Sequence, residues 1–331
     1  MVKSVTITPA GLSETEVATV GGNNTEVQYN NNGQLAGCGN LLVVNNQIVF
    51  PSQNNSPTAP TSGMTPFVQT VANRPQLFAI DSINEVRKFQ NNIYFNRASG
   101  MCAVGSGTTT FTTFSCTAWS TVGNNTGRSL SASISGQISR CGITTGTLAD
   151  ITGRYEPQGR AWLGSSAALG GFHYFKRFGI SDPTTVANPR TFVGLSNTTA
   201  APTNVNPATL VNSIGFAQDP SFALPGNFYI MINGTAATGY TLNTGIPITN
   251  NQMYDIQIFT VSGSGIIGFF LQNLETGATF DTTINLTSLP ANQRPANNVL
   301  FGGRMWRSNN TLVPAETCGM DFAFALTETP Y

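Results

Sequence analysis

The chain has 331 residues, of which 40% are hydrophobic and only 9% are charged, against roughly 25% charged residues in an ordinary soluble domain. Fifteen basic and fifteen acidic residues cancel, which leaves no basic excess to follow a nucleic-acid backbone. The longest apolar run, GIIGFFL, is far shorter than the roughly 18 residues of a membrane span. We therefore expect neither nucleic-acid binding nor membrane insertion.

The first fifty residues combine short β-forming runs with turn residues. TEVQYNNNGQLAG (25–37) places Tyr29 and Leu35 among asparagines and glycines, and LLVVNNQIVF (41–50) contains an Asn-Asn pair suited to a two-residue hairpin turn. This much apolar surface is too little for a core of its own, whereas several copies around an axis would bury it. The sequence predicts that residues 1–50 are stabilised by association.

Two further regions precede the strongest strand signal. Residues 51–75 are rich in proline, serine, threonine and asparagine, which predicts an extended connector. Residues 76–153 are rich in β-branched residues and thin in large apolar ones. They are interpreted as a separate middle β-rich region.

Residues 154–331 carry the densest period-two alternation of apolar and polar residues. In ATFDTTINL the alternation puts Phe280 and Ile284 on one face and Asp281 on the other. The preceding LETG supplies Gly277 for a positive φ in a hairpin loop, and DFAFALTE is expected to place Phe322, Phe324 and Leu326 on one face. The fold class predicted is all-β, with a C-terminal antiparallel β-sandwich of jelly-roll or lectin-like type.

No catalytic signature is recognisable: GxSxG, P-loop, HExxH and Rossmann patterns are absent from the sequence. The single histidine, His173 in GGFHYFKRFGI, is expected to be a packed or strand-edge residue, and one histidine nearly excludes a zinc site. We predict no catalytic residue, no metal site and no cofactor.

Carboxylate pairs are the remaining route to an enzyme, because glycoside hydrolysis needs two of them about 5–9 Å apart. Asp182, Asp219, Asp255 and Asp321 lie in the sandwich region. The sequence favours turn and strand-edge roles for each and leaves calcium ligation by loop aspartates open.

A candidate binding segment is GGRMWRSNN, in which Trp306 stands between Arg304 and Arg307. A sugar face would stack on an aromatic ring beside planar donors, and alternation in a strand points Arg304 to the same side as Trp306. The competing interpretation is that Trp306 packs in the sandwich core. The two differ in the exposure of the ring.

Two stretches resemble a known family. TEVQYNNNGQLAG is similar to the VQYN-type segment at the N-terminal end of many bacteriophage fibre proteins. GFHYFKRFGISDPTTVANPRTFVGLSN (171–197) and NSIGFAQDPS (212–221) resemble the lectin-like β-sandwich at the C-terminus of tailed-phage fibres. On this resemblance the residues of virion docking and trimerisation are Val27, Gln28, Tyr29, Asn30 and Leu35.

The resemblance implies a non-enzymatic, homotrimeric virion fibre that joins other virion proteins through its N-terminus and meets a host-surface glycan or receptor with its C-terminal knob. The start, MVKSVTITPAG, lacks the apolar stretch of a secretory signal, so assembly in the host cytoplasm is expected. The alternatives are a head or neck fibre, a capsid decoration protein, and a glycan depolymerase. The last is disfavoured because no repeat of about 20–30 residues is visible.

Overall fold

The computed structural model of the chain describes residues 3–8, 11–16, 26–31, 34–44, 47–53, 55–84, 86–88, 97–103, 111–114, 119–128, 133–145, 151–164, 170–310 and 316–330. The chain forms two compact units, one made of residues 1–70 and 75–91 and the other of residues 71–74 and 92–331. Nearly all described elements are strands, which confirms the all-β prediction. The helical elements among the described residues are α1 (Ile134–Gln137), η1 (Pro207–Thr209), η2 (Leu286–Ser288) and η3 (Ala291–Gln293). No helix in these ranges is long and apolar enough to cross a membrane.

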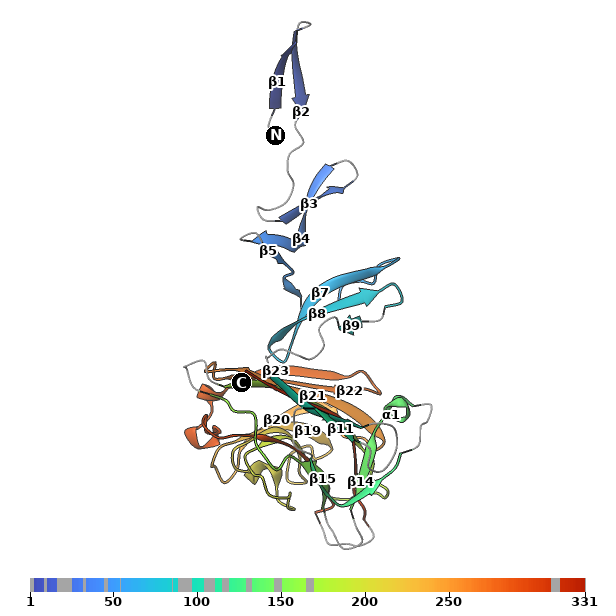
Figure 1. Cartoon of the computed structure of the whole chain (residues 1–331), viewed down its shortest axis with the longest axis vertical. Helices are drawn as coiled ribbons and strands as arrows, with labels where there is room; N and C mark the ends of the chain where they lie inside the picture. The colour runs from blue at the N-terminus through green and yellow to red at the C-terminus, as the bar shows by residue number, and fades with distance from the viewer. Residues whose placement is uncertain are drawn as a thin grey trace. The chain divides into compact units, whose positions relative to one another are not determined.

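The first unit consists of small sheets, whose strands are drawn in blue tones in Figure 1. One pairs β1 (Lys3–Thr8) with β2 (Gly11–Glu16); the next has the order β3 (Glu26–Asn31), β4 (Gln34–Val44), β5 (Gln47–Val49); the last has the order β6 (Ser52–Gln53), β7 (Met64–Val71), β8 (Arg74–Asp81), β9 (Val86–Lys88). Since β6 and β7 lie within residues 51–75, the predicted connector is partly strand.

The two-residue turn predicted within residues 41–50 is consistent with the strand register, and the β3–β4 hairpin has the same spacing. Asn31 pairs with Gln34 and Val44 pairs with Gln47, so two residues join the strands in each hairpin. Of the residues assigned to docking and trimerisation, Val27, Gln28, Tyr29 and Asn30 lie on β3 and Leu35 lies on β4. The Val27 side chain is partly buried, and the other four side chains lie outside the described part of the chain.

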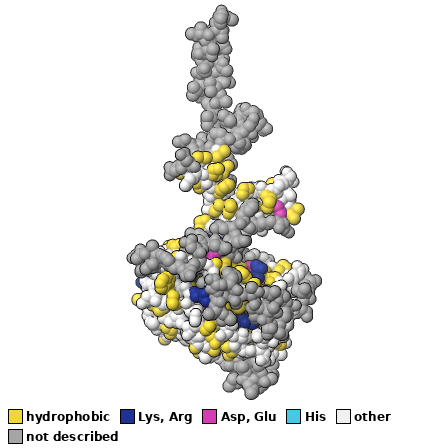
Figure 2. Space-filling model, viewed as in Figure 1, with side chains coloured by type: hydrophobic (Ala, Val, Ile, Leu, Met, Phe, Trp, Pro, Cys, Tyr) yellow, Lys and Arg dark blue, Asp and Glu magenta, His cyan; other side chains and the backbone are white. Residues whose placement is uncertain are grey.

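The β4–β5 hairpin leaves an apolar surface open to solvent in a single copy of the chain. Ile48 is 68% exposed, and its neighbours are more than one-third exposed. Figure 2 shows yellow side chains gathered over this hairpin. The set, named the β4–β5 strip below, comprises Val43, Val44, Ile48, Val49 and Phe50.

The second unit is a β-sandwich of two antiparallel sheets, whose stacked layers Figure 1 shows with β21–β23 in one and β15, β19 and β20 in the other. The larger sheet has the order β11 (Phe111–Phe114), β10 (Arg97–Ala103), β25 (Gly319–Thr329), β16 (Gly171–Ile180), β21 (Gln252–Val261), β22 (Ile266–Asn273), β23 (Thr279–Asn285), with β14 (Cys141–Thr144) paired to β25 and β13 (Asn124–Thr126) paired to β14. The smaller sheet has the order β12 (Ser120–Val122), β15 (Ile151–Tyr155), β24 (Gly302–Ser308), β17 (Arg190–Ser196), β18 (Ser213–Gln218), β19 (Asn227–Asn233), β20 (Tyr240–Pro247).

The predicted middle region does not stand by itself. β8 and β9 belong to the first unit, whereas β10 to β15 belong to the two sheets of the sandwich. The sandwich therefore begins near residue 92 and not at residue 154. The physical reason is that a strand poor in large apolar residues becomes stable when it pairs with a strand that has a buried face, as β10 and β14 do with β25.

The core between the sheets is built by alternating side chains, as an aligned sandwich requires. The β22–β23 hairpin confirms its prediction: Ile284 is buried, Asp281 faces outward, and Gly277 takes φ +72° in the loop. Central members of the core include Phe178, Phe216, Tyr254, Phe269 and Met305.

The prediction for DFAFALTE was wrong in its second half. Where β25 pairs with β16, Phe322 lies opposite Phe178 and Phe324 lies opposite Arg177. Ala323 is therefore an extra residue that forms a β-bulge. The bulge reverses the faces, so Phe322 and Ala325 join the core, whereas Phe324 packs against Phe175 with ring centroids 5.5 Å apart. An extra residue shifts a period-two pattern by one position.

The interior also contains a lysine. Lys176 on β16 is fully buried, and its Nζ lies 3.8 Å from the centroid of the Trp119 ring and 5.0 Å from that of Phe322. Among the described residues, Nζ has no hydrogen-bond partner. Burial lowers the pKa of Lys176 well below its ordinary value, although nearby Glu156 raises it in part.

Candidate functional site

Two of the four aspartates named above meet at one end of the sandwich. β16 ends at Ile180, and Ser181 and Asp182 lead into the next loop beside the start of β25. The Ser181 N–H donates to the carbonyl of Gly319 (3.0 Å), and the Gly319 N–H donates to Asp182 Oδ1 (2.9 Å). A Cβ at Gly319 would stand 2.1 Å from the Ser181 oxygen. This close backbone approach brings Asp182 near Asp321.

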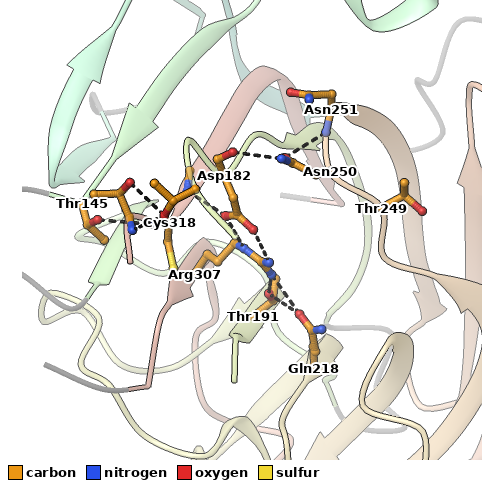
Figure 3. Close-up of polar contacts among 12 residues, drawn as sticks. Thr145, Asp182, Thr191, Gln218, Thr249, Asn250, Asn251, Arg307 and Cys318 are labelled. Carbon is orange, nitrogen blue, oxygen red and sulfur yellow. Dashed lines mark hydrogen bonds and ion pairs between the residues drawn. The ribbon is translucent and has the colours of Figure 1, made fainter. Parts of the chain in front are cut away.

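Arg307 of β24 holds Asp182 in a buried, two-pronged ion pair. Its Nε and Nη2 donate to Oδ1 and Oδ2 of Asp182 at 2.7 and 2.5 Å. Its Nη1 donates to Thr191 Oγ1 (2.7 Å) and Gln218 Oε1 (2.9 Å), and Figure 3 shows the guanidinium lying between Asp182 and these two residues. Fork-to-fork pairing is the strong geometry for these groups. Arg307 is thus fully used within the protein.

Asp321 is shared by two arginines from a different part of the chain. Arg128 Nε donates to Oδ1 (2.7 Å), and Arg140 Nε donates to Oδ2 (2.8 Å). Ser181 Oγ donates to Oδ1 (2.8 Å) and accepts from Arg128 Nη2 (2.7 Å). Both guanidinium side chains remain partly open to solvent, at 18% and 12% exposure. No sequence motif identifies these arginines as site residues, because only the tertiary structure brings them to Asp321.

These groups border an open pocket of about 340 Å³, a volume at the small end of ligand sites (about 300–1,000 Å³). Its wall is mainly polar, and the arginines supply its positive charge. The lining residues are Arg128, Ser135, Arg140, Ile180, Ser181, Asp182, Pro183, Asn251, Gln252, Met253 and Asp321. We name this the Arg128–Arg140 pocket.

The carboxylates of this end are engaged as hydrogen-bond acceptors rather than poised for acid–base chemistry. Retaining or inverting hydrolysis needs one carboxylic acid with a proton to give and a second carboxylate free to act. Asp182 and Asp321 are each bound by arginine, as are Asp219 by Arg190 (2.8 Å) and Asp255 by Arg177 (2.7 Å). Within the described ranges no group of three His, Cys, Asp or Glu side chains could hold a metal ion.

The segment GGRMWRS forms β24, and its three predicted binding residues are buried. Trp306 has 0% exposure and packs with Phe192, Met231 and Ile151 on the outer side of the smaller sheet. The surface-stacking role predicted for Trp306 is therefore wrong, since the ring offers no open face. β24 runs between β15 and β17 in the middle of its sheet, where both faces of a strand can be covered.

Arg304 and Arg307 are also turned to internal partners. Arg304 donates from Nη2 to the carbonyls of Thr198 (2.8 Å) and Ala200, and its guanidinium lies 5.8 Å from the centroid of the Tyr155 ring. Burial lowers the pKa of Arg304 to about 10. Neither arginine presents a donor to a ligand in the way the sequence suggested.

His173 is a packed histidine, as predicted. It is fully buried, with Nδ1 2.8 Å from Glu328 Oε2 and 2.7 Å from Arg74 Nη1, and Nε2 3.2 Å from Gln257 Oε1. Burial lowers the pKa of His173. Arg74 belongs to the short segment 71–74 of the second unit, so this cluster anchors that segment to the sheet.

A second pocket, of about 440 Å³, includes Leu163, Val261, Arg294 and Asn297 in its wall. The one arginine among its lining residues, Arg294, donates from Nε and Nη2 to the carbonyls of Leu289 and Thr287 (both 2.8 Å). The Arg128–Arg140 pocket is the better candidate, since two guanidinium groups with open donors line it.

Comparisons with known proteins give likenesses of fold. No family model matches the chain, and no curated protein matches it. Among solved structures, arcelin-5, a lectin-like defence protein from Phaseolus vulgaris, is similar at 10% identity and TM-score 0.43, covering 70% of this chain and 97% of that one. Lectin II from Ulex europaeus is similar at 10% identity and TM-score 0.41, covering 71% and 100%. Peanut lectin is similar at 11% identity and TM-score 0.40, covering 63% and 97%. Similarity at this level supports no conclusion about what the chain binds.

Proposed function

We propose that this chain is a homotrimeric fibre subunit of a tailed bacteriophage, displayed on the virion, and that its β-sandwich binds carbohydrate on the host surface without cleaving it. The observation that carries the proposal is the Arg128–Arg140 pocket: an open, polar cavity on a well-packed sandwich, rimmed by fixed donors. Sugars are recognised by such planar donors and amides. The resemblance of residues 25–37, 171–197 and 212–221 to phage fibres supplies the biological setting.

The surface composition supports an adhesive role. A chain with 9% charged residues and no net charge has little long-range attraction for charged surfaces, so contact is governed by local hydrogen bonds. Weak single-site binding to sugars is strengthened when several sites act together. Three copies in a fibre would supply that multiplicity.

The β4–β5 strip supports the trimer. Apolar side chains that lie together on the surface of a monomer mark sites of association, and a sheet this small has no core to hide them. Rotational symmetry would let the same strip of each copy pack around one axis.

The carbohydrate arm is tested with the purified full chain on a panel of bacterial surface polysaccharides. We expect binding to a subset of the panel, with higher apparent affinity for immobilised, multivalent glycan than for free oligosaccharide, and no release of reducing ends. Binding to no polysaccharide would remove the carbohydrate proposal. Release of reducing ends, lost in a variant of one Asp or Glu, would make the chain a depolymerase instead.

The assembly arm is tested by mass measurement in solution. We expect a species of three times the 35.0 kDa chain mass, and dissociation in an Ile48→Ser variant because Ile48 is 68% exposed within the β4–β5 strip. Ile83→Ser is the matched control, since Ile83 is 71% exposed in the same unit but outside the strip. A monomeric wild-type chain at micromolar concentration would contradict the trimer.

A further inference from the structure

The Arg128–Arg140 pocket contains more open hydrogen-bond donors than open acceptors. Asp321 Oδ1 already accepts two bonds and Oδ2 accepts one. Asp182 Oδ1 also accepts two, from Arg307 and the Gly319 N–H. In contrast, Arg128 bonds through Nε and Nη2 and Arg140 through Nε and Nη1, which leaves one Nη of each without a partner among the described residues.

The charged residues that line the pocket are two arginines and two aspartates, namely Arg128, Arg140, Asp182 and Asp321. Asp182 is already paired with Arg307, and Asp321 is paired with Arg128 and Arg140. The carboxylates of the wall are therefore engaged, whereas each lining arginine keeps an open cationic donor.

Both guanidinium groups are held in place before a ligand arrives. Arg128 lies against the backbone of Gly142, where a Cβ would stand 2.5 Å from its Cζ. Arg140 is fixed by Asp321 and by the carbonyls of Ile138 (3.3 Å) and Ser135. Donors that are ordered in the free protein lose less entropy on binding.

We infer that the Arg128–Arg140 pocket binds an acidic sugar, whose anionic group, a carboxylate or a phosphate ester, is received by the open Nη donors of Arg128 and Arg140. The inference rests on the proposed carbohydrate binding and assigns its ligand class. One open Nη from each guanidinium can donate a charge-assisted hydrogen bond to an oxygen of either anion. The remaining hydroxyls of the sugar would meet Asn251 and Gln252, which also line the pocket.

The wild-type chain is tested first, by calorimetry with methyl glucuronoside, glucose 6-phosphate and methyl glucoside, and with an acidic polysaccharide before and after reduction of its carboxyl groups. We expect the anionic ligands to bind at least about tenfold more tightly than the neutral ones, with the difference shrinking as salt is added. The tighter of glucuronoside and phosphate identifies the anionic group. Equal binding of acidic and neutral forms would overturn the inference while leaving carbohydrate binding intact.

Variants then place the site. Arg128→Gln and Arg140→Gln each leave Asp321 one arginine, and each is expected to weaken anionic-sugar binding about tenfold or more while neutral-sugar binding changes little. Arg190→Gln is the matched control, because Arg190 also pairs with a buried aspartate, Asp219, at 2.8 Å and is 20% exposed, but lies outside the pocket. Unchanged binding of the anionic sugars in both pocket variants would refute the site. If neither variant folds, the comparison of anionic and neutral ligands on the wild-type chain decides whether an acidic sugar is bound.

Discussion

Replacing Trp306 by alanine is expected to lower the free energy of unfolding by about 3–5 kcal/mol. The side chain is fully buried and packs with Phe192 and Met231, so its removal both loses transfer energy and leaves a cavity between strands that are held by sheet pairing. Thermal or denaturant unfolding of the second unit measures the effect. An unfolding transition like that of the wild type would show that the ring is not in a packed cluster.

Trp306→Phe separates packing from polarity. The Nε1–H of Trp306 is buried without a hydrogen-bond partner in the part of the chain that the structure describes. An unpaired buried N–H carries a desolvation cost that phenylalanine does not have. We expect this variant to unfold much closer to the wild type than the alanine variant does. Because the ring has no open face, the phenylalanine variant should also bind polysaccharide normally; loss of binding with retained stability would restore a ligand role for Trp306.

The residues around Trp306 explain why the sequence misplaced it. The alternation of residues correctly indicates a strand, but its interpretation assumes that one face of the strand is exposed to solvent. Met305 enters the core between the sheets, while Trp306 enters the cluster on the other side. Arg304 and Arg307 alternate to opposite sides of this strand and are both buried, so polarity does not mark an outer surface and the exposure of the strand cannot be read from its period.

Local patterns were sufficient where the structure depends on neighbours in the chain. The β22–β23 hairpin follows from alternation and from a glycine at positive φ, and the pairing of Val44 with Gln47 follows from the Asn-Asn pair between them. In contrast, the bulge in β25 arises where that strand pairs with β16, more than a hundred residues earlier. No window of sequence contains both partners.

The candidate pocket could not be predicted from the sequence for the same reason. Arg128 and Arg140 come from residues 76–153, which the sequence predicts to be separate from the sandwich, whereas Asp321 comes from the last strand. The aspartates were identified as turn or edge residues, which is what Asp219 is, since its Oδ1 accepts from the Ser221 N–H at 2.9 Å. What could not be foreseen is that each aspartate has an arginine partner.

Lys176 carries the second large expected effect, in the opposite direction: replacing it by methionine is expected to raise the free energy of unfolding near pH 7 by about 1–3 kcal/mol. The Nζ atom is buried and has no hydrogen-bond partner within the described ranges. Its position 3.8 Å from the Trp119 ring centroid favours the charged form by about 2 kcal/mol or more, because the contact is desolvated. Burial nevertheless lowers the pKa of Lys176 well below its ordinary value, so desolvation outweighs the ring contact. Methionine retains most of the apolar stem.

The gain should depend on pH. Since the pKa of Lys176 is lowered in the folded protein, the unfolded chain binds more protons between the folded pKa and the ordinary value of about 10.4, and stability rises with pH across that window. The methionine variant lacks this rise, so its advantage should shrink from about pH 7 toward about pH 10. Tyr174→Phe is the control: the Tyr174 hydroxyl is also buried without a partner, and burial raises its pKa well above the ordinary value, so it stays neutral and its variant should keep the wild-type slope. Denaturant unfolding at several pH values measures all three proteins. A methionine variant less stable than the wild type, or one with the same pH slope, would show that Lys176 contributes favourably as a charged residue inside the sandwich.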